Sequence, residues 1–170
     1  MHKTGSCVVI SVGFNATNDE GGGKVLPEGF GHLIPRKEGE DALGIIWHSS
    51  VFKGYGNAGD CQRRYTVMIG GDRIEEAFAY SESKLESLAR EAIYKHLGVL
   101  PPHDAVCSIS YARDSISHYQ VGHLKSICGI REALPSTFQV AGASFDGVSV
   151  HDCITSGKNA AKSLLQNFKS

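Results

Sequence analysis

The stretch that most constrains the fold lies between residues 138 and 168. It begins with the apolar run Phe138–Ala141, which predicts a short buried strand ending at Gly142. A loop closed by Gly147 follows, and apolar or small residues then recur at alternating steps of four and three, as on a helix laid against a sheet. These residues are Val150, Ile154, Gly157, Ala161, Leu164 and Phe168. A strand, a glycine turn and a helix N-terminus form a ready site for a nucleotide or an anionic ring, because unpaired amides and the positive end of the helix dipole point at the ligand.

Two more specific motifs are incomplete in this loop. Gly142 and Gly147 have the spacing of a phosphate-binding loop, but Val148 stands where that motif requires lysine, which argues against an NTPase. Ser144 has the place of the nucleophile in G-x-S-x-G, but Asp146 replaces the second glycine, which argues against a hydrolase. From these residues alone, a plain structural turn between a strand and a helix is the commonest interpretation.

Composition places the chain among ordinary globular proteins. Its 170 residues are 41% hydrophobic and 21% charged, with a net charge of −1, so one domain with a real core is expected. The sequence has no basic stripe, which argues against nucleic acid as a partner. It also has no apolar run of membrane-spanning length and no signal-peptide pattern. Attachment to a membrane surface remains open.

Cysteine and histidine give no metal-binding pattern. The five cysteines are odd in number and lack C-x-x-C spacing, which predicts reduced thiols in an intracellular compartment. His118 and His123 are five residues apart, which is not one helical face, and His151 with Cys153 is an isolated local pair. We therefore predict no metal site.

The rest of the chain predicts alternating strands and helices. The clearest helix is Ser83–Leu97, with a capping box of Ser83 and Glu86, an apolar stripe, and Gly98 at its end. A weaker helix is expected over Gly122–Leu134. Loops are expected over Asn15–Lys24 and Lys53–Cys61. Strands are predicted over Cys7–Phe14, Leu43–His48, Tyr65–Ile69 and Ala105–Tyr111.

Six segments resemble one known family when they are taken together and in order. They are GFGHLIP (Gly29–Pro35), LGIIWHSSVF (Leu43–Phe52), TVMIGG (Thr66–Gly71), HLGV (His96–Val99), YQVGH (Tyr119–His123) and AGASFDGVSVHDCITSGKNAA (Ala141–Ala161). The chain resembles the oxygen-dependent protoporphyrinogen oxidases, FAD enzymes of the amine-oxidase-like superfamily. The first and third segments narrow the resemblance to this family. One departure is Ser117-His118 before Tyr119, where the family usually has proline and glutamine.

The resemblance implies an α/β (or α+β) fold that covers only the C-terminal third to half of such an enzyme. Residues 1–136 would belong to the substrate-binding domain, with a mixed sheet, and residues 137–170 would supply a C-terminal strand, loop and helix of the Rossmann-like FAD-binding domain. The two would form a single compact unit. The N-terminal dinucleotide fingerprint G-x-G-x-x-G is absent from the sequence.

The resemblance also implies two groups of site residues. Gly147, Val148, Ser149 and Val150 would present helix amides to the pyrimidine end of the flavin, with Asp152 favoured in the first turn by the helix dipole. The substrate cavity would be lined by Phe30, Gly31, Leu33 and Met68. From spacing alone, Met68 is more often core filler than a substrate contact. No residue is identified as a catalytic base, and the resemblance does not require one.

The implied function is FAD-dependent oxidation of protoporphyrinogen IX to protoporphyrin IX, with molecular oxygen as acceptor, in haem biosynthesis. Such enzymes in animals and fungi imply a location on the mitochondrial inner membrane, peripheral membrane association, and a homodimer at full length. Two alternatives stay open. The first alternative is a truncated, catalytically silent fragment of such an enzyme, and the second is a related flavin amine oxidase or desaturase.

Overall fold

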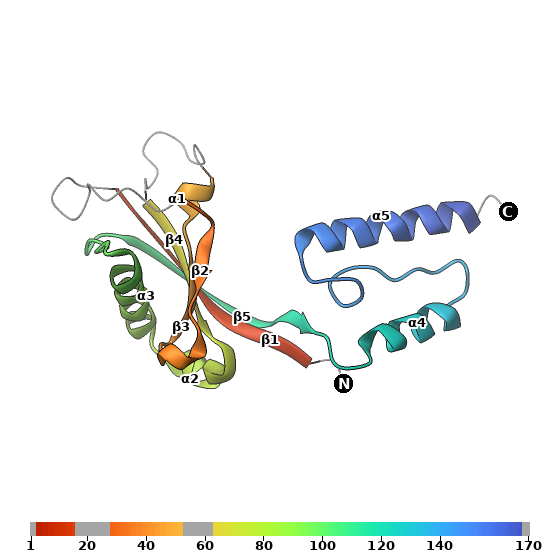
Figure 1. Cartoon of the computed structure of the whole chain (residues 1–170), viewed down its shortest axis with the longest axis horizontal. Helices are drawn as coiled ribbons and strands as arrows, with labels where there is room; N and C mark the ends of the chain where they lie inside the picture. Colours follow the sequence, from red (N-terminus) through yellow and green to blue (C-terminus); the bar gives the residue numbers. More distant parts are fainter. Residues whose placement is uncertain (1–2, 16–27, 53–62, 168–170) are drawn as a thin grey trace. The chain divides into compact units, whose positions relative to one another are not determined.

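A computed structural model describes residues 3–15, 28–52 and 63–167 (Figure 1). The chain divides into two compact units, one of Ser6–Arg113 and the other of Met1–Gly5 with Asp114–Ser170. The predicted loop Lys53–Cys61 lies outside the described residues, as does the predicted loop Asn15–Lys24 apart from Asn15. The assignment of residues 1–136 and 137–170 to two domains of a larger enzyme stays a prediction.

The described residues form both strands and helices. The strands are β1 (Lys3–Phe14), β2 (Gly31–Leu33), β3 (Ala42–Ile46), β4 (Arg63–Gly70) and β5 (Val106–His118). The helices are α1 (His48–Val51), α2 (Ile74–Ala79), α3 (Glu82–Leu97), α4 (His123–Ala133) and α5 (Val150–Asn167), with short 3-10 turns at Arg36–Glu38 and Gly71–Arg73. The predicted strand ending at His48 is therefore shorter, because His48 begins α1.

The strands form one five-stranded sheet in the order β2-β3-β4-β1-β5. β1 pairs with β4, β4 with β3, and β3 with β2, all in antiparallel register. This corrects the expectation of a mixed sheet. Parallel neighbours need crossover connections of a dozen or more residues, whereas β2 and β3, which follow each other along the chain, simply turn back on one another.

Helix α3 covers one face of this sheet (Figure 1). Alternate residues of a strand point to opposite faces, and Tyr65, Val67 and Ile69 are all at most 1% exposed. Burying an aliphatic side chain of this size contributes about 1.5–3 kcal/mol, so this helix and the sheet form the main core. The other buried members include Val8, Ile10, Val12, Ile45, Leu85, Ala89 and Ile93.

The start of α3 differs from the predicted capping box. The cap is Ser81, whose Oγ accepts a hydrogen bond from the Lys84 amide at 3.2 Å. Glu86 does not reach back to the helix start, because it holds the Arg90 guanidinium at 2.6 Å. Arg90 in turn donates to backbone carbonyls after the helix, among them Pro101 O at 3.2 Å. The helix ends as predicted at Gly98, which has a φ of +63°.

The last part of the chain contains two further corrections. Phe138–Ala141 is irregular, and Phe138 is 61% exposed. A strand needs a neighbour to pair with its backbone, and the sheet of the described residues does not include this segment. Helix α5 forms as predicted, but its expected apolar stripe is exposed: Val150 is 73% and Ile154 52% accessible.

We predict that Ser81→Ala destabilises the unit Ser6–Arg113 by about 1 kcal/mol, the usual cost of losing a serine cap. Ser83→Ala is the matched control and should change stability much less, because Ser83 lies inside the helix. Urea unfolding followed by far-UV circular dichroism measures both. Equal effects of the two substitutions would contradict the assignment of Ser81 as the cap.

Candidate functional site

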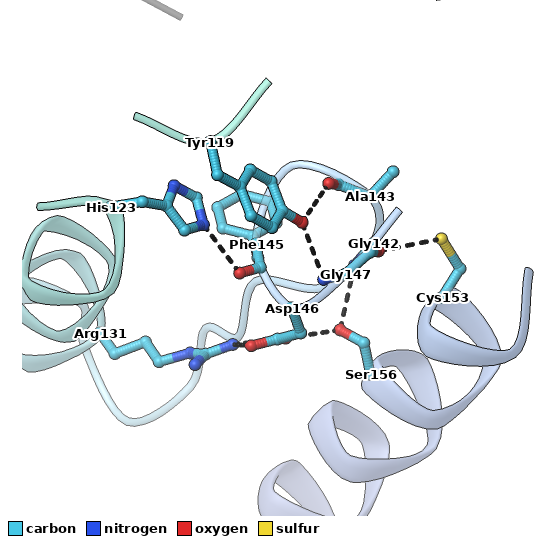
Figure 2. Close-up of polar contacts among 10 residues, drawn as sticks. All are labelled: Tyr119, His123, Arg131, Gly142, Ala143, Phe145, Asp146, Gly147, Cys153 and Ser156. Carbon is cyan, nitrogen blue, oxygen red and sulfur yellow. Dashed lines mark hydrogen bonds and ion pairs between the residues drawn. The ribbon is translucent and has the colours of Figure 1, made fainter. Parts of the chain in front are cut away.

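The loop before α5 is organised around Tyr119 (Figure 2). Its hydroxyl donates to the Ala143 carbonyl at 2.6 Å and accepts from the Gly147 amide at 2.7 Å. The Tyr119 ring stacks on His123, with 3.9 Å between centroids and 6° between planes. His123 Nε2 lies 3.0 Å from the Phe145 carbonyl. Two side chains near the start of α4 therefore fix both sides of the loop.

A carboxylate ties the same loop to two helices. Asp146 receives two hydrogen bonds from Arg131 Nη2 of α4, at 2.7 and 2.6 Å, and one from Ser156 Oγ of α5, at 2.7 Å. These interactions, that with Arg131 first, lower the pKa of Asp146. Ser156 is only 5% exposed, and its Oγ also accepts from the Gly142 amide at 3.1 Å. The glycine loop is thus held by side chains of its own unit at Gly142, Asp146 and Gly147.

The start of α5 is a capping box that the sequence analysis did not identify. Ser149 Oγ accepts from the Asp152 amide at 3.1 Å, and Asp152 Oδ2 accepts from the Ser149 amide at 3.2 Å. The Ser149 hydroxyl also donates to Asp152 Oδ2 at 2.6 Å. The S-x-x-D spacing was a usable signal for this arrangement. Asp152 therefore places its negative charge at the positive end of the helix dipole.

These contacts divide the four amides predicted to face a flavin. The Gly147 amide donates to Tyr119 and the Ser149 amide to Asp152. Within the described residues, the Val148 and Val150 amides have no hydrogen-bond partner, and their side chains are 51% and 73% exposed. The two N–H groups of Val148 and Val150 are thus the donors left for a ligand. Contact of the four residues with flavin stays a prediction.

Gly147 is required by the chain itself. Its φ is +130°, a region that side chains strongly disfavour. A Cβ at this position would lie 2.5 Å from the carboxylate carbon of Asp152. The capping box and a larger residue at position 147 therefore cannot coexist without a shift of the loop.

The predicted substrate residues lie together in the other unit. Leu33 pairs with Gly44, and Gly44 pairs with Met68, so Leu33 and Met68 flank a glycine on one face of the sheet. Leu33 is 78% exposed and Met68 half-buried. This is the sheet face opposite α3, since Met68 alternates with the buried Val67 and Ile69.

Of the remaining two predicted substrate residues, Gly31 begins the edge strand β2 and Phe30 directly precedes it. Phe30 is 63% exposed, and its carbonyl accepts from the Trp47 amide at 2.9 Å. Gly31 pairs with Ile46, and a Cβ on it would lie 2.2 Å from the Ile45 carbonyl oxygen. Close approach of β2 to β3 therefore explains Gly31 structurally. The role of all four residues in binding substrate stays a prediction.

Comparisons with known proteins decide the family. A sequence profile described as flavin containing amine oxidoreductase matches residues 2–165. The chain belongs to the flavin-containing amine oxidoreductase family. Family membership implies a flavin cofactor and oxidoreductase chemistry for the enzymes that it comprises.

Within this family, the chain is similar to porphyrinogen oxidases. It is 34% identical over 167 residues to the protoporphyrinogen oxidase of Macaca fascicularis and 33% identical to that of Homo sapiens, in each case over 92% of this chain and 34% of the relative. It is 29% identical to the coproporphyrinogen III oxidase of Bacillus subtilis, over 97% of this chain and 34% of that relative. The chain thus spans about a third of the length of these flavin oxidoreductases.

A solved structure from Exiguobacterium sp. 255-15, described as a protoporphyrinogen oxidase, has a similar fold. The TM-score is 0.69 at 21% identity, over 96% of this chain and 35% of that one. At this identity the match shows the fold, and it confirms that the α/β arrangement is a portion of that fold.

Several features outside the predicted sites complete this description. In the ranges 3–15, 28–52 and 63–167, no group of three or more His, Cys, Asp or Glu residues is placed to hold a metal ion. No helix within those ranges has both the length and the apolarity to cross a membrane.

Sequence reasoning missed the roles of Tyr119, Arg131 and Asp146. The signal for Tyr119 was the YQVGH segment, whose residues Tyr119 and His123 bond to backbone groups more than twenty residues further along the chain.

We predict that Tyr119→Phe frees the Gly147 amide, because the phenyl ring cannot accept its hydrogen bond. Hydrogen exchange at this amide should accelerate about tenfold, the equivalent of one net hydrogen bond. Tyr94→Phe is the matched control, because Tyr94 is 56% exposed on α3. Exchange resolved by NMR measures both variants, and unchanged protection at Gly147 in the Tyr119→Phe protein would show that its hydroxyl does not hold the loop.

Proposed function

We propose that this chain contributes a flavin-facing helix end and one substrate wall to an FAD-dependent oxidase that converts protoporphyrinogen IX to protoporphyrin IX with oxygen as acceptor. The observation that carries the proposal is the similarity to named porphyrinogen oxidases along 92% of the chain. The site geometry supports it, because the loop before α5 is held by side chains of Tyr119, Arg131 and Ser156 and leaves the amides of Val148 and Val150 open to a ligand.

The chain's own residues would act mainly by hydrogen bonding and by excluding water. The N–H groups of Val148 and Val150 suit an electron-rich ring edge, because both residues are uncharged. Neither amide would have to give up a hydrogen bond within the chain in order to bind it. When bound, the flavin supplies the acceptor for the hydride that leaves a bridging carbon of the substrate. Leu33 and Met68 would hold the apolar macrocycle and keep water away from it.

The choice of protoporphyrinogen IX as the substrate rests on the family resemblance. Three mammalian protoporphyrinogen oxidases are 33–34% identical to the chain. Three other protoporphyrinogen oxidases are 25–29% identical, the same range as the two bacterial coproporphyrinogen III oxidases at 29% and 26%. The tobacco relative is named as mitochondrial, which agrees with the proposed location on the mitochondrial inner membrane. The homodimer and the peripheral membrane association remain predictions from the family resemblance.

If the oxidase assignment applies to the chain by itself, the purified chain retains flavin absorbance after incubation with FAD and passage through a desalting column. Gly147→Ala should lose that flavin, since the new Cβ would overlap Asp152 and move the loop. Gly129→Ala on α4 is the matched control, because nothing lies within 4 Å of a Cβ there. Equal flavin retention by the two variants would contradict the loop assignment. A parent chain that stays colourless would favour the catalytically silent fragment.

Leu33→Asp in the flavin-loaded protein should retain flavin but oxidise protoporphyrinogen IX at least about tenfold more slowly, because a carboxylate replaces an apolar wall. Leu100→Asp is the control, since Leu100 is also exposed, at 53%, but lies outside the strands of the sheet. The appearance of porphyrin fluorescence in air measures the rate. Coproporphyrinogen III in the same assay tests the choice of substrate, and equal rates of the Leu33→Asp and Leu100→Asp proteins would remove Leu33 from the substrate wall.

A further inference from the structure

Two histidines meet on the sheet face that α3 covers. His32 is the middle residue of the edge strand β2, and His96 lies in the last turn of α3. Their ring centroids are 4.8 Å apart, with 40° between the ring planes. The His32 ring also lies 5.7 Å from the uncharged indole ring of Trp47, the residue that follows β3. His32 therefore joins the edge of the sheet to the helix by contacts between rings.

The charged groups around the two histidines are centred on Glu40, which precedes β3. His96 Nε2 lies 2.8 Å from Glu40 Oε2, and Lys95 Nζ lies 2.8 Å from Glu40 Oε1. The contacts with Lys95 and then with His96 lower the pKa of the Glu40 carboxyl. Glu38 and Glu91 add negative charge near Lys95. The end of α3 is thus tied to the segment before β3 by an ionised carboxylate.

His32 itself takes no part in these ion pairs. Its Nε2 is buried and has no hydrogen-bond partner among the residues that the structure describes. Burial, followed by the nearby His96, lowers the pKa of His32, and Glu40 opposes this only in part. A charged ring at this place would lose its hydration without gaining a partner. The packed form of His32 is therefore the neutral one, and acid would place a charge inside the packing, beside a second histidine.

The strand that carries His32 also carries two of the predicted substrate residues. Neighbouring residues of a strand point to opposite faces, so Gly31 and Leu33 lie on the face opposite α3. β2 has only three residues and pairs with β3 alone. Because the strand is so short, a change in the packing of His32 on one face displaces Gly31 and Leu33 on the other.

We propose that His32 is a positioning residue for the substrate wall: as a neutral ring packed against Trp47 and His96 it holds β2 in place, and its protonation releases the strand. This inference rests on the proposed function, because it takes Gly31 and Leu33 to contact the substrate. The stabilisation of β2 by neutral His32 is complete above the ordinary histidine pKa of about 6.5. It is lost as pH falls below that value, since the released strand then binds a proton more readily than the packed one.

Hydrogen exchange resolved by NMR tests the release of β2. The Trp47 amide donates to the Phe30 carbonyl at 2.9 Å, and the Ile34 amide donates to the Leu43 carbonyl at 2.8 Å, one at each end of the β2–β3 pairing. Between pH 7 and pH 5, we expect the protection of both amides, corrected for intrinsic exchange, to fall by at least about threefold. The amides of the central strands β1 and β4 should keep their protection. Constant protection at Ile34 and Trp47, or an equal loss throughout the sheet, would overturn the proposal.

Three variants assign the effect to His32. His32→Gln removes the titrating ring and should abolish the pH dependence, whereas His103→Gln, at an exposed histidine between α3 and β5, should keep it. His96→Gln should shift the loss of protection toward neutral pH, because His96 lowers the pKa of His32. This variant tests the proposal even where His32→Gln fails to fold. A pH dependence that survives His32→Gln, or that His96→Gln leaves unshifted, would overturn the proposal.

Turnover of the flavin-loaded protein tests the consequence for the substrate wall. Lowering the pH should raise KM for protoporphyrinogen IX more than it lowers kcat, because the wall acts in binding the substrate. His32→Gln should remove this additional rise in KM, and His103→Gln should keep it. Loss of β2 protection with an unchanged KM would contradict the proposed substrate wall, whereas constant protection would contradict the role of His32. The two failures are therefore distinguishable.

Discussion

The packing of α3 against one face of the sheet determines which side chains lie on the opposite face. Residues such as Val67 and Ile69 show that every second residue of β4 packs in the core beneath α3. The intervening residues point to the opposite face of the sheet. Those positions are Arg64, Thr66 and Met68. A strand with one face buried has a strongly specified register. The core therefore fixes which side chains of β4 lie on the face opposite α3.

The loop before α5 is positioned by a different principle. None of its apolar residues is fully buried, and polar contacts hold it: Tyr119 to two backbone groups, Arg131 to Asp146, and Ser156 to Gly142 and Asp146. Because each hydrogen bond is directional, such a loop keeps a defined shape even though Val148 and Val150 are exposed. The same contacts explain why Gly147 is required, independently of any ligand.

The sequence predicted the elements whose signal is local. The stripe of α3 and its stop at Gly98, and the strand Tyr65–Ile69 within β4, were correct because periodicity and chain stereochemistry decide them. Predictions that needed distant partners failed. Phe138–Ala141 has strand-like composition but no sheet neighbour in the described part of the chain, and Ser83 was chosen as the cap although Ser81 holds the Lys84 amide. The side chains that hold the loop were missed for the same reason. Tyr119, for example, accepts a hydrogen bond from the Gly147 amide, twenty-eight residues further along the chain.

The capping box bears on how α5 would act on a flavin. A helix dipole favours an anion at its N-terminus by about 0.3–1 kcal/mol at an exposed site, and salt screens this effect. The Asp152 carboxylate already occupies that end and opposes further negative charge there. A hydrogen bond to a charged group contributes about 1.5–3 kcal/mol, more than the dipole does. Any stabilisation of a reduced flavin by this helix would therefore come from the direct N–H contacts of Val148 and Val150, and it would depend on the loop geometry that Tyr119 maintains.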